Sequence, residues 1–417
     1  MSPTAFNEDG REVNAWWRRW ASILAACLVL IAATRWPLVP ARHLYGASNV
    51  DFALALDDFD PARFQPPPPG DPVYVALTRW MRPFVPTVEL LFPLSGVIGS
   101  AAAVAALWWV AEMMFGARAG ALAALLLGLN PKFWMAGVAD YARVYAVLGA
   151  AVVGGLAWKS LSVSTRRSSA IHFCASAAAL GFFAGFRPEL LLLLAPLILF
   201  SAWQRRAAYH WWHWLAAAVC GAATTLPWLL IAARYSGGFA RGRFPEAAAL
   251  IAIPAACLMG AWALTRLPST WFWWSAPAAV AVNAALFFYP SGWSNYSRIE
   301  RTERTAEQVY ARVGLLEKMG PVTVLTHGAS ITPREIGYYF PRVPILDLES
   351  QPAENSEVVI RAGRVIWLDP VAPADARCFD GLREALGGEA GSEGPVHWAN
   401  LPGGTRFRAG RQSIAAH

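Results

Sequence analysis

Acidic residues are concentrated in one short stretch of a chain that is otherwise largely apolar. Between Asn49 and Leu77 the sequence contains five aspartates and a run of four prolines. The aspartates are Asp51, Asp57, Asp58, Asp60 and Asp71. A carboxylate can remove the proton from an attacking hydroxyl group, so this stretch is a candidate source of a general base. Asp51 is the preferred candidate because it lies near the start of the stretch, whereas Asp57 and Asp58 have the simpler interpretation of solvated loop charges.

A short helix over residues 49–59 is predicted to lie along the membrane surface where Asp51, Asp57, Asp58 and Asp60 fall. The side chains that could anchor it in the interface are Phe52, Leu54, Leu56 and Phe59. Pro66 to Pro69 then impose a stiff, extended backbone that returns the chain to the next apolar run. On this helix we expect Asp51 to face a cavity that contains Arg187, with Asp57 and Asp58 facing water.

Arg187 is the strongest candidate for binding an anion such as phosphate. It lies between two apolar runs in "FRPELL", where Pro188 can open the next helix and Glu189 suits the positive end of that helix. An arginine at membrane depth is costly unless it is paired or functional. The structural alternative is that Arg187 pairs with Glu189 or extends to the membrane surface.

Four other arginines and one aspartate are further candidates. Arg234, Arg241 and Arg243 surround the "SGG" sequence at residues 236–238, and they could hold a phosphate bidentately or be ordinary loop charges. Asp140 and Arg143 lie together in "GVADYAR" between two apolar runs. Asp140 is a second candidate for a catalytic carboxylate, with Arg143 as a second phosphate ligand, or the two could form an ion pair that stabilises a turn.

The composition indicates a polytopic membrane protein. Of the 417 residues 56% are hydrophobic and 15% are charged, against about 25% charged residues in an ordinary soluble domain. Apolar runs near the roughly 20 residues that cross a bilayer occur nine times. They cover residues 20–34, 90–115, 119–136, 144–158, 171–186, 190–203, 211–233, 247–264 and 271–289. We therefore predict an all-α bundle of about nine transmembrane helices over residues 20–290, with an outer loop at 35–89.

The basic residues suggest an orientation for this bundle. Residues 1–19 contain three arginines before the first apolar run and lack a convincing cleavage site, so this run is interpreted as an uncleaved span. The connectors after the fourth and sixth runs contain only basic charges: Lys159, Arg166, Arg167, Arg205 and Arg206. The positive-inside rule then places the N-terminus and these connectors in the cytoplasm. After nine crossings the tail lies outside.

The tail, residues 291–417, is predicted to be a small α/β domain. Its expected strands are residues 322–326, 343–348 and 358–369. Thr332 followed by a proline predicts the start of a helix in "TPREIGYYF", and residues 387–395 have the composition of a flexible connector. The first strand has no glycine-rich phosphate loop after it, which argues against a nucleotide site.

The sequence predicts neither a metal nor a cofactor. Four of the five cysteines lie within apolar runs, only Cys378 lies in the tail, and no C-x-x-C spacing occurs. Much of the net charge of +7 is explained by membrane orientation, so a nucleic-acid partner is not expected. The 21 tryptophans gather at the ends of apolar runs, which fits an aromatic belt better than sugar stacking.

Several motifs resemble those of bacterial family 39-like glycosyltransferases. The most specific are "FALALDDFDPARFQPPPPG" and "AGFRPELLLLLAP". The others are "NPKFWMAGVADYARVYA", "LPWLLIAARYSGGF" and "VTVLTHGASITPREIGYYFPRVPILDL". This family belongs to the protein-mannosyltransferase and lipid A aminoarabinose-transferase group, which has the GT-C fold. The resemblance implies an inverting enzyme that takes a sugar from a polyprenyl-phosphate carrier on the outer membrane face, with the catalytic carboxylate in the first outer loop.

The sequence departs from the family at the expected catalytic position. The usual aspartate is replaced by Ser48, two usual histidines by Phe64 and Pro67, and a usual tyrosine by Asp71. Asp51 lies three residues after Ser48, hence on the same face of a helix, and could reach a similar point. Three interpretations follow: the base has moved to Asp51, the site is altered or lost, or the alignment is mistaken.

The leading hypothesis is a glycosyltransferase of the bacterial inner membrane. Its expected partners are a polyprenyl-phosphate sugar donor, a lipid, glycan or protein acceptor, and membrane lipids. The alternatives are a catalytically degenerate relative that serves as a glycan-assembly or binding partner, and a transporter. A transporter should have charged or broken segments in mid-span, whereas these apolar runs are nearly free of charge.

Overall fold

The computed structural model describes most of the chain and divides it into two units. The described residues are 22–23, 25–38, 43–44, 46–67, 70–235, 244–288, 296–329, 331–348, 357–360, 363–368, 379, 382, 391–393, 396–400 and 405–408. Unit 1 comprises Met1–Ala41 and Asp51–Tyr296, and unit 2 comprises Arg42–Val50 and Ser297–His417.

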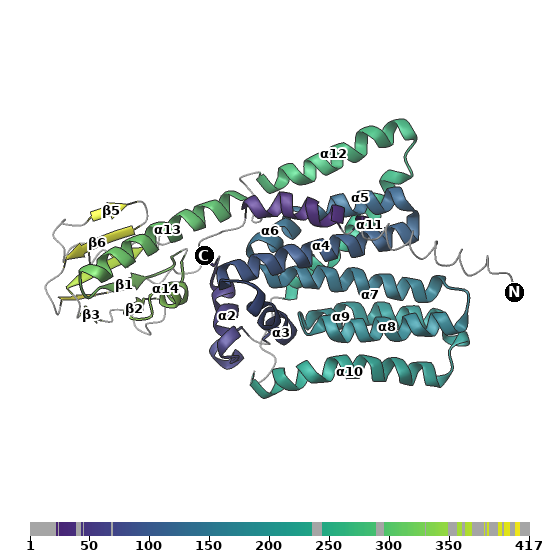
Figure 1. The fold of residues 1–417 in the computed structure, drawn as a ribbon, viewed down its shortest axis with the longest axis horizontal. Coiled ribbons are helices and arrows are strands. Elements are labelled where there is room, and N and C mark those ends of the chain that lie inside the picture. The colour runs from purple at the N-terminus through teal and green to yellow at the C-terminus, as the bar shows by residue number, and fades with distance from the viewer. Residues whose placement is uncertain are drawn as a thin grey trace, which may run out of the picture. The chain divides into compact units, whose positions relative to one another are not determined.

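Unit 1 is a bundle of long helices (Figure 1). Its helices after the acidic stretch are α4 (Val88–Phe115), α5 (Ala117–Gly128), α6 (Pro131–Ala139), α7 (Val144–Ser162), α8 (Arg166–Ala184), α9 (Glu189–Gln204), α10 (Trp211–Tyr235), α11 (Phe244–Thr265) and α12 (Ser269–Phe288). Short 3₁₀ turns, η1 (Trp36–Leu38), η4 (Tyr141–Arg143) and η5 (Arg206–Ala208), also occur. Side-chain caps fix several starts, since Thr87, Asn130 and Thr165 accept hydrogen bonds from the first turns of α4, α6 and α8.

The helices of unit 1 make the chain a membrane protein. Five helical segments among the described residues are long and apolar enough to cross a bilayer: Val88–Phe115, Tyr141–Ser162, Trp211–Arg234, Ala248–Thr265 and Ser269–Phe288. The pair α5 and α6, bent by 58°, would make a sixth. Ala25–Arg35 and Glu189–Gln204 are shorter apolar helices. Helices occupy all nine predicted runs, but the number of actual crossings stays a prediction.

Buried Arg35 braces the bend between α5 and α6. Its guanidinium donates two hydrogen bonds of 3.1 Å to the carbonyl of Gly128, the last residue of α5. It also lies over the ring of Phe133 in α6, 5.1 Å from the centroid. Gly137 leaves room for it, because a Cβ at this position would lie 2.5 Å from Arg35 Nε. Arg35 therefore fixes the direction in which α6 leads to Asp140.

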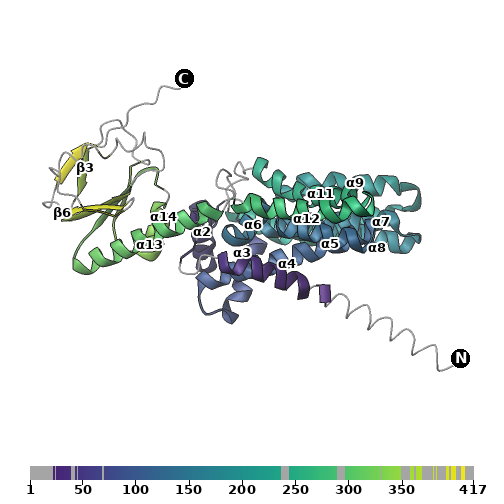
Figure 2. The same ribbon diagram turned by 90° about the horizontal axis from the view of Figure 1, so that it is seen from above.

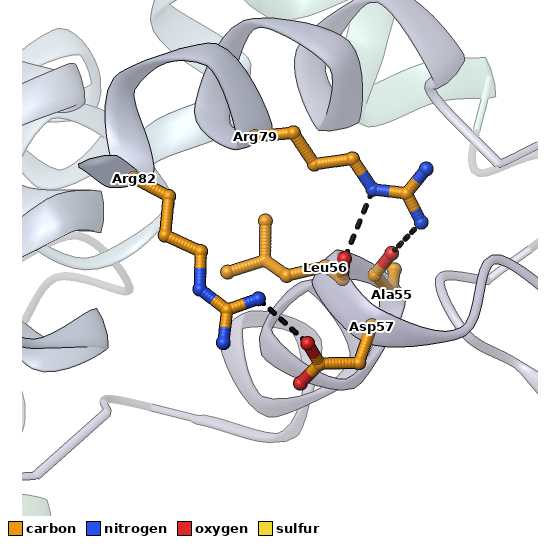
Figure 3. Close-up of polar contacts among 5 residues, drawn as sticks. All are labelled: Ala55, Leu56, Asp57, Arg79 and Arg82. Carbon is orange, nitrogen blue, oxygen red and sulfur yellow. Dashed lines mark hydrogen bonds and ion pairs between the residues drawn. The ribbon is translucent and has the colours of Figure 1, made fainter.

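The acidic stretch contains the predicted short helix, α2, and a second helix, α3, that was not predicted. Pro68 and Pro69 of the predicted extended segment lie outside the described residues. α2 covers Gly46–Asp57 and α3 covers Pro72–Met81, with the turns η2 (Pro61–Arg63) and η3 (Arg82–Phe84). Figure 3 shows Arg79 of α3 donating to the carbonyls of Leu56 and Ala55 at the end of α2, at 3.0 and 2.7 Å. A cation at a helix C-terminus satisfies carbonyls that lack a partner within the helix. This contact ties the two helices together.

α2 is enclosed by protein rather than resting on lipid, which differs from the sequence expectation. Phe52 and Leu56, predicted to anchor a surface helix, are both buried. The Phe52 ring packs edge-on against that of Tyr74 in α3, with the centroids 4.9 Å apart. Val50, Ala53 and Ala55 are also buried, so α2 has apolar residues around most of its circumference.

Unit 2 contains a mixed five-stranded sheet in the order β2-β1-β4-β6-β5. Its elements are α13 (Tyr296–Met319), β1 (Thr323–Thr326), α14 (Pro333–Tyr339), β2 (Ile345–Asp347), β4 (Arg364–Leu368), β5 (Gly391–Glu393) and β6 (Val396–Asn400). β1 pairs in parallel with β2 and β4, and β6 is antiparallel to β4 and β5. β3 (Glu357–Ile360) and β7 (Thr405–Arg408) form a separate antiparallel pair.

The core of unit 2 lies on both faces of this sheet. Val324, Ile366 and Val396 share one face with Val309 and Val313 of α13, which Figure 2 shows beside the sheet. Leu325, Val365 and Trp367 face the other side and pack with Phe379 and Leu382. This alternation follows from the two-residue period of a strand.

Three features of unit 2 differ from the sequence predictions. Residues 358–369 form two strands in separate sheets, broken near Gly363. The helix α13 was not predicted. Residues 391–393, expected in a connector, form the edge strand β5, where Gly391 allows the ring of Trp398 to lie against its backbone. The predicted cap Thr332 is present and forms a capping box with Glu335.

Candidate active site

A buried carboxylate lies beside an arginine where α3 meets the turn between α8 and α9. Asp71 precedes the first residue of α3, and its side chain is only 8% exposed. Its Oδ2 lies 3.6 Å from Nη1 of Arg187, whose side chain is 21% exposed. Oδ1 of Asp71 is buried and has no hydrogen-bond partner within the described residues. A buried acceptor of this kind can receive a hydrogen bond from a substrate hydroxyl.

Two contacts position Asp71 beside Arg187. The Val73 amide donates to the carbonyl of Gly185, just before Arg187, at 3.1 Å. Gly185 has to be a glycine because a Cβ there would collide with Val73. One residue farther along α3, Tyr74 Oη lies 3.0 Å from Ser95 Oγ of α4. The start of α3 is thus held between α4 and the α8–α9 turn.

The backbone of Asp71 has an unusual conformation. Its φ of 38° and ψ of 55° lie in the left-handed region, which costs a residue with a side chain about 1 to 2 kcal/mol. Such strain persists only where the surrounding structure imposes it, and it is concentrated at functional sites. The strained backbone and the buried carboxylate therefore support the same location for a site.

Three more charged residues belong to this cluster. Glu189 begins α9, and its Oε2 is buried without a hydrogen-bond partner in the described part of the chain. Asp140 precedes the turn η4, Arg143 is its last residue, and the two form an ion pair of 2.6 Å between Oδ2 and Nε. All three are close enough to Asp71 to influence its pKa. The structure thus brings together the predicted candidates Asp140, Arg143 and Arg187.

Burial raises the pKa of Asp71 to about 7. Desolvation of the carboxylate is the largest cause, Arg187 opposes it, Glu189 and Asp140 raise the pKa further, and Arg143 lowers it. A carboxyl group that titrates near neutral pH is well matched to general-base catalysis, because it is a stronger base than an ordinary aspartate.

The raised pKa predicts that Asp71→Asn stabilises the protein at high pH. The folded state holds the proton of Asp71 more tightly than the unfolded state, so the free energy of unfolding falls as pH rises from about 4 to about 7. Asparagine lacks this titration, and its advantage should reach as much as about 4 kcal/mol above pH 7. Thermal unfolding in detergent between pH 5 and 8.5 measures the difference.

The matched control is Asp57→Asn, at an exposed aspartate of the same stretch. Asp57 pairs with Arg82 at 2.6 Å (Figure 3), but its side chain is 74% exposed, and such pairs contribute about 0 to 1 kcal/mol. Its replacement should change the unfolding temperature little at any pH. The same pH dependence in wild type and Asp71→Asn would contradict the assigned burial effect.

The aspartates of the acidic stretch have different surroundings. Asp57 and Asp58 are exposed, and Asp60 caps η2 by accepting from the Ala62 amide at 3.0 Å. Asp51, the predicted base, is 6% exposed in α2. Burial thus separates Asp51 and Asp71 from the other three. The predicted orientation of Asp51 toward Arg187 stays a prediction.

The remaining candidates lie outside this cluster or outside the described residues. Arg234 lies on the last turn of α10 and is exposed. Arg241 and Arg243 lie outside the described residues. Within the described ranges, no group of three or more histidines, cysteines or acidic residues could hold a metal ion.

Comparison with solved structures gives the fold. No protein-family model and no curated sequence matches the chain. The chain is similar to a crystal structure of ArnT from Cupriavidus metallidurans bound to undecaprenyl phosphate, with 12% identity, a TM-score of 0.50 and coverage of 92% of this chain and 97% of that one. This chain has the GT-C fold. The aligned residues cover nearly the whole length of that ArnT chain.

Two further solved structures resemble the chain more weakly. Apo ArnT from Cupriavidus metallidurans aligns at 12% identity and a TM-score of 0.47, covering 93% of this chain and 98% of that one. The oligosaccharyltransferase of Archaeoglobus fulgidus aligns at 16% identity and a TM-score of 0.41, covering 65% of this chain and 37% of that one. The GT-C assignment depends on the first structure alone.

Asp71 is the site residue that the sequence reasoning missed as a candidate base. The sequence shows Asp71 only as one of five aspartates in the acidic stretch, at a position where the resembling family usually has tyrosine. The available signal was an aspartate between a glycine and a proline, which predicts a helix start, combined with the apolar surroundings of "VYVAL". That signal does not reveal the pairing with Arg187.

Proposed function

We propose that the chain is an inverting glycosyltransferase that moves a sugar from a polyprenyl-phosphate carrier to an acceptor on the outer face of the bacterial inner membrane. The observation that carries the proposal is the buried Asp71 carboxylate beside Arg187 at one end of a GT-C helix bundle. The reaction needs a base for the acceptor hydroxyl and cations for the phosphate that leaves, and this cluster supplies both.

Each residue of the cluster has a proposed role. Asp71 or Asp51 accepts the proton of the acceptor hydroxyl as its oxygen attacks the anomeric carbon. Arg187 and Arg143 stabilise the negative charge that grows on the carrier phosphate as the bond to the sugar breaks. Asp140, which orients Arg143 through their ion pair, contributes to positioning. Arg234, Arg241 and Arg243 are further candidates for the donor phosphate.

The orientation follows the sequence argument. Nine crossings with the N-terminus in the cytoplasm place the Asp71 cluster and residues 291–417 outside. The carrier class is supported by the likeness to ArnT, whose crystal structure contains undecaprenyl phosphate. The acceptor is a lipid, glycan or protein hydroxyl.

The decisive experiment follows both the reaction and the cell envelope. The purified chain in nanodiscs should release polyprenyl phosphate from a member of a panel of labelled polyprenyl-phosphate sugars, and a deletion strain should lack one sugar in one glycoconjugate. Complementation with wild type should restore that sugar. Unchanged glycoconjugates in the deletion strain, together with no turnover of any donor, would exclude the proposed activity.

The second candidate function is that of a degenerate relative that binds a glycan or assists its assembly. The observation in its favour is Ser48 at the position where the family has its catalytic aspartate. Such a protein should bind a polyprenyl-phosphate sugar without turning it over. Such a protein would act through a separate transferase. The deletion strain would then accumulate incomplete glycan because that enzyme works less well without its partner.

A further inference from the structure

A second group of charged side chains lies at the opposite end of α8 from Arg187. A cavity of about 600 Å³ is lined by Arg166 and Arg167 of α8 and by His210 and His213 at the start of α10. α8 has 19 residues, so its ends are roughly 28 Å apart at about 1.5 Å per residue. The cavity therefore lies on the membrane face opposite the Asp71 cluster, the face predicted to be cytoplasmic.

The positive charge of this cavity has no acidic counterpart. The sequence contains no aspartate or glutamate between Tyr141 and Pro188 or between Leu190 and Pro245. Within the described part of the chain, neither Arg166 nor Arg167 forms an ion pair. Both side chains are therefore available to bind an anion from outside the chain.

The neighbouring basic residues have structural contacts instead. Arg205 donates to the carbonyls of Leu161 and Val163, which ties the two connectors on this face together. The Arg206 guanidinium lies over the Trp203 ring, 4.3 Å from its centroid. Basic residues that only orient a protein in the membrane do not have to line a cavity. Arg166 and Arg167 do line one, together with His210 and His213.

The same cavity has an apolar side toward the membrane interior. Ala170, Ile171 and Cys174 also line it, and they lie successively farther along α8 from the two arginines. Ile171 is 58% exposed, on a helix of a membrane protein. The arginines match the charged headgroup of a lipid, and the apolar residues farther along α8 match its acyl chains. This arrangement favours a lipid over a free ion.

We propose that this cavity binds the phosphate headgroup of an anionic glycerophospholipid from the leaflet opposite the Asp71 cluster. Arg166 and Arg167 form charge-assisted hydrogen bonds to the phosphate oxygens. His213 Nδ1 accepts from the His210 amide at 3.0 Å, so a neutral His213 ring carries its proton on Nε2 and can donate from there. The acyl chains follow Ile171 and Cys174 along α8.

The size and location agree with this ligand. Ligand pockets typically have volumes of roughly 300 to 1,000 Å³, and basic pockets between membrane helices on the cytoplasmic side bind anionic headgroups. The exposed pair Trp211 and Trp212 stands beside His210 and His213, at the level where aromatic residues mark the membrane interface. The inference does not depend on the proposed transferase reaction.

Native mass spectrometry of the full chain in detergent tests the proposal. The purified protein is titrated with phosphatidylglycerol, and separately with zwitterionic phosphatidylcholine of the same acyl chains. We expect phosphatidylglycerol to bind at least tenfold more tightly. The double variant Arg166→Ala/Arg167→Ala should lose about tenfold or more of this affinity, because each cation near an anionic lipid contributes favourably. Arg118→Ala should bind like the wild type, because Arg118 is exposed and follows the second apolar run, which places it on the same predicted face but away from this cavity.

The remaining variant and additive complete the test. Arg167→Gln removes only one of the positive charges that orient the protein in the membrane. It should weaken phosphatidylglycerol binding about threefold to tenfold. This single variant tests the proposal if the double variant does not reach the membrane. Inorganic phosphate at equal concentration should not raise the unfolding temperature, whereas phosphatidylglycerol should. Equal binding of the two lipids, unchanged affinity in the arginine variants, or stabilisation by inorganic phosphate alone would each overturn the proposal.

Discussion

Arg187→Ala should reduce sugar transfer by about 100-fold or more while leaving the amount of protein in the membrane unchanged. A preorganised cation aimed at a leaving phosphate contributes several kcal/mol to the transition state. Arg187→Lys should recover only part of the activity, because an ammonium group lacks the planar fork that binds two phosphate oxygens. Initial rates with a labelled polyprenyl-phosphate sugar measure both variants.

The contact between Arg187 and Asp71 allows a sharper version of this experiment. Removing Arg187 leaves the Asp71 carboxylate buried without its 3.6 Å partner, which raises the pKa of Asp71 further. If Arg187 acted only through Asp71, the rate of Arg187→Ala would recover at high pH. If it binds phosphate, the loss should persist at every pH.

Arg82→Ala provides the matched control for Arg187→Ala. Arg82 is an exposed arginine that pairs with Asp57, so its removal should change transfer less than about threefold. Full activity of Arg187→Ala would exclude Arg187 from phosphate binding. Loss of Arg187→Ala from the membrane, with Arg187→Lys present and fully active, would assign Arg187 a structural role.

Much of the bundle could be predicted from the sequence because membrane spans depend on local composition. Each apolar run coincides with a helix, and the α5–α6 bend occurs at Pro131, within a single predicted run. The helix α13 was not predicted, because its sequence "SRIERTERTAEQVYARVG" is rich in charged residues and contains no apolar run. Its buried residues Ala306, Val309 and Val313 recur on one face and pack on the sheet of unit 2.

The candidate site could be predicted only in part, because burial depends on contacts between distant segments. Asp140, Arg143 and Arg187 could be selected from their places between apolar runs. Asp71 could not be distinguished from the other aspartates, because its burial requires the contact between Val73 and Gly185. The sequence also predicted α2 to be a surface helix. Its apolar residues could have contacted lipid, whereas in the structure Phe52 contacts the ring of Tyr74.

Replacement of the catalytic base should cost about 10² to 10⁴ in rate, and the structure leaves two buried aspartates for this role. Asp71→Asn should suffer this loss if the carboxylate beside Arg187 is the base. Asp51→Asn should suffer it if the base has moved by one helical turn from Ser48. Asp57→Asn and Asp58→Asn are the matched controls and should be nearly silent, because both side chains are exposed.

The pH dependence and a rescue variant distinguish these two bases. A base must be deprotonated to act, so with Asp71 as the base the rate should fall as pH drops below about 7, the pKa to which burial raises this group. Asp71→Asn would remove both the activity and this dependence. With Asp51 as the base, Ser48→Asp should restore transfer to Asp51→Asn, because the two positions share a helical face. Full activity of either asparagine variant excludes that aspartate as the base. If the wild type turns over no donor and Ser48→Asp gains activity, the chain is a degenerate transferase that retains the phosphate-binding arginines.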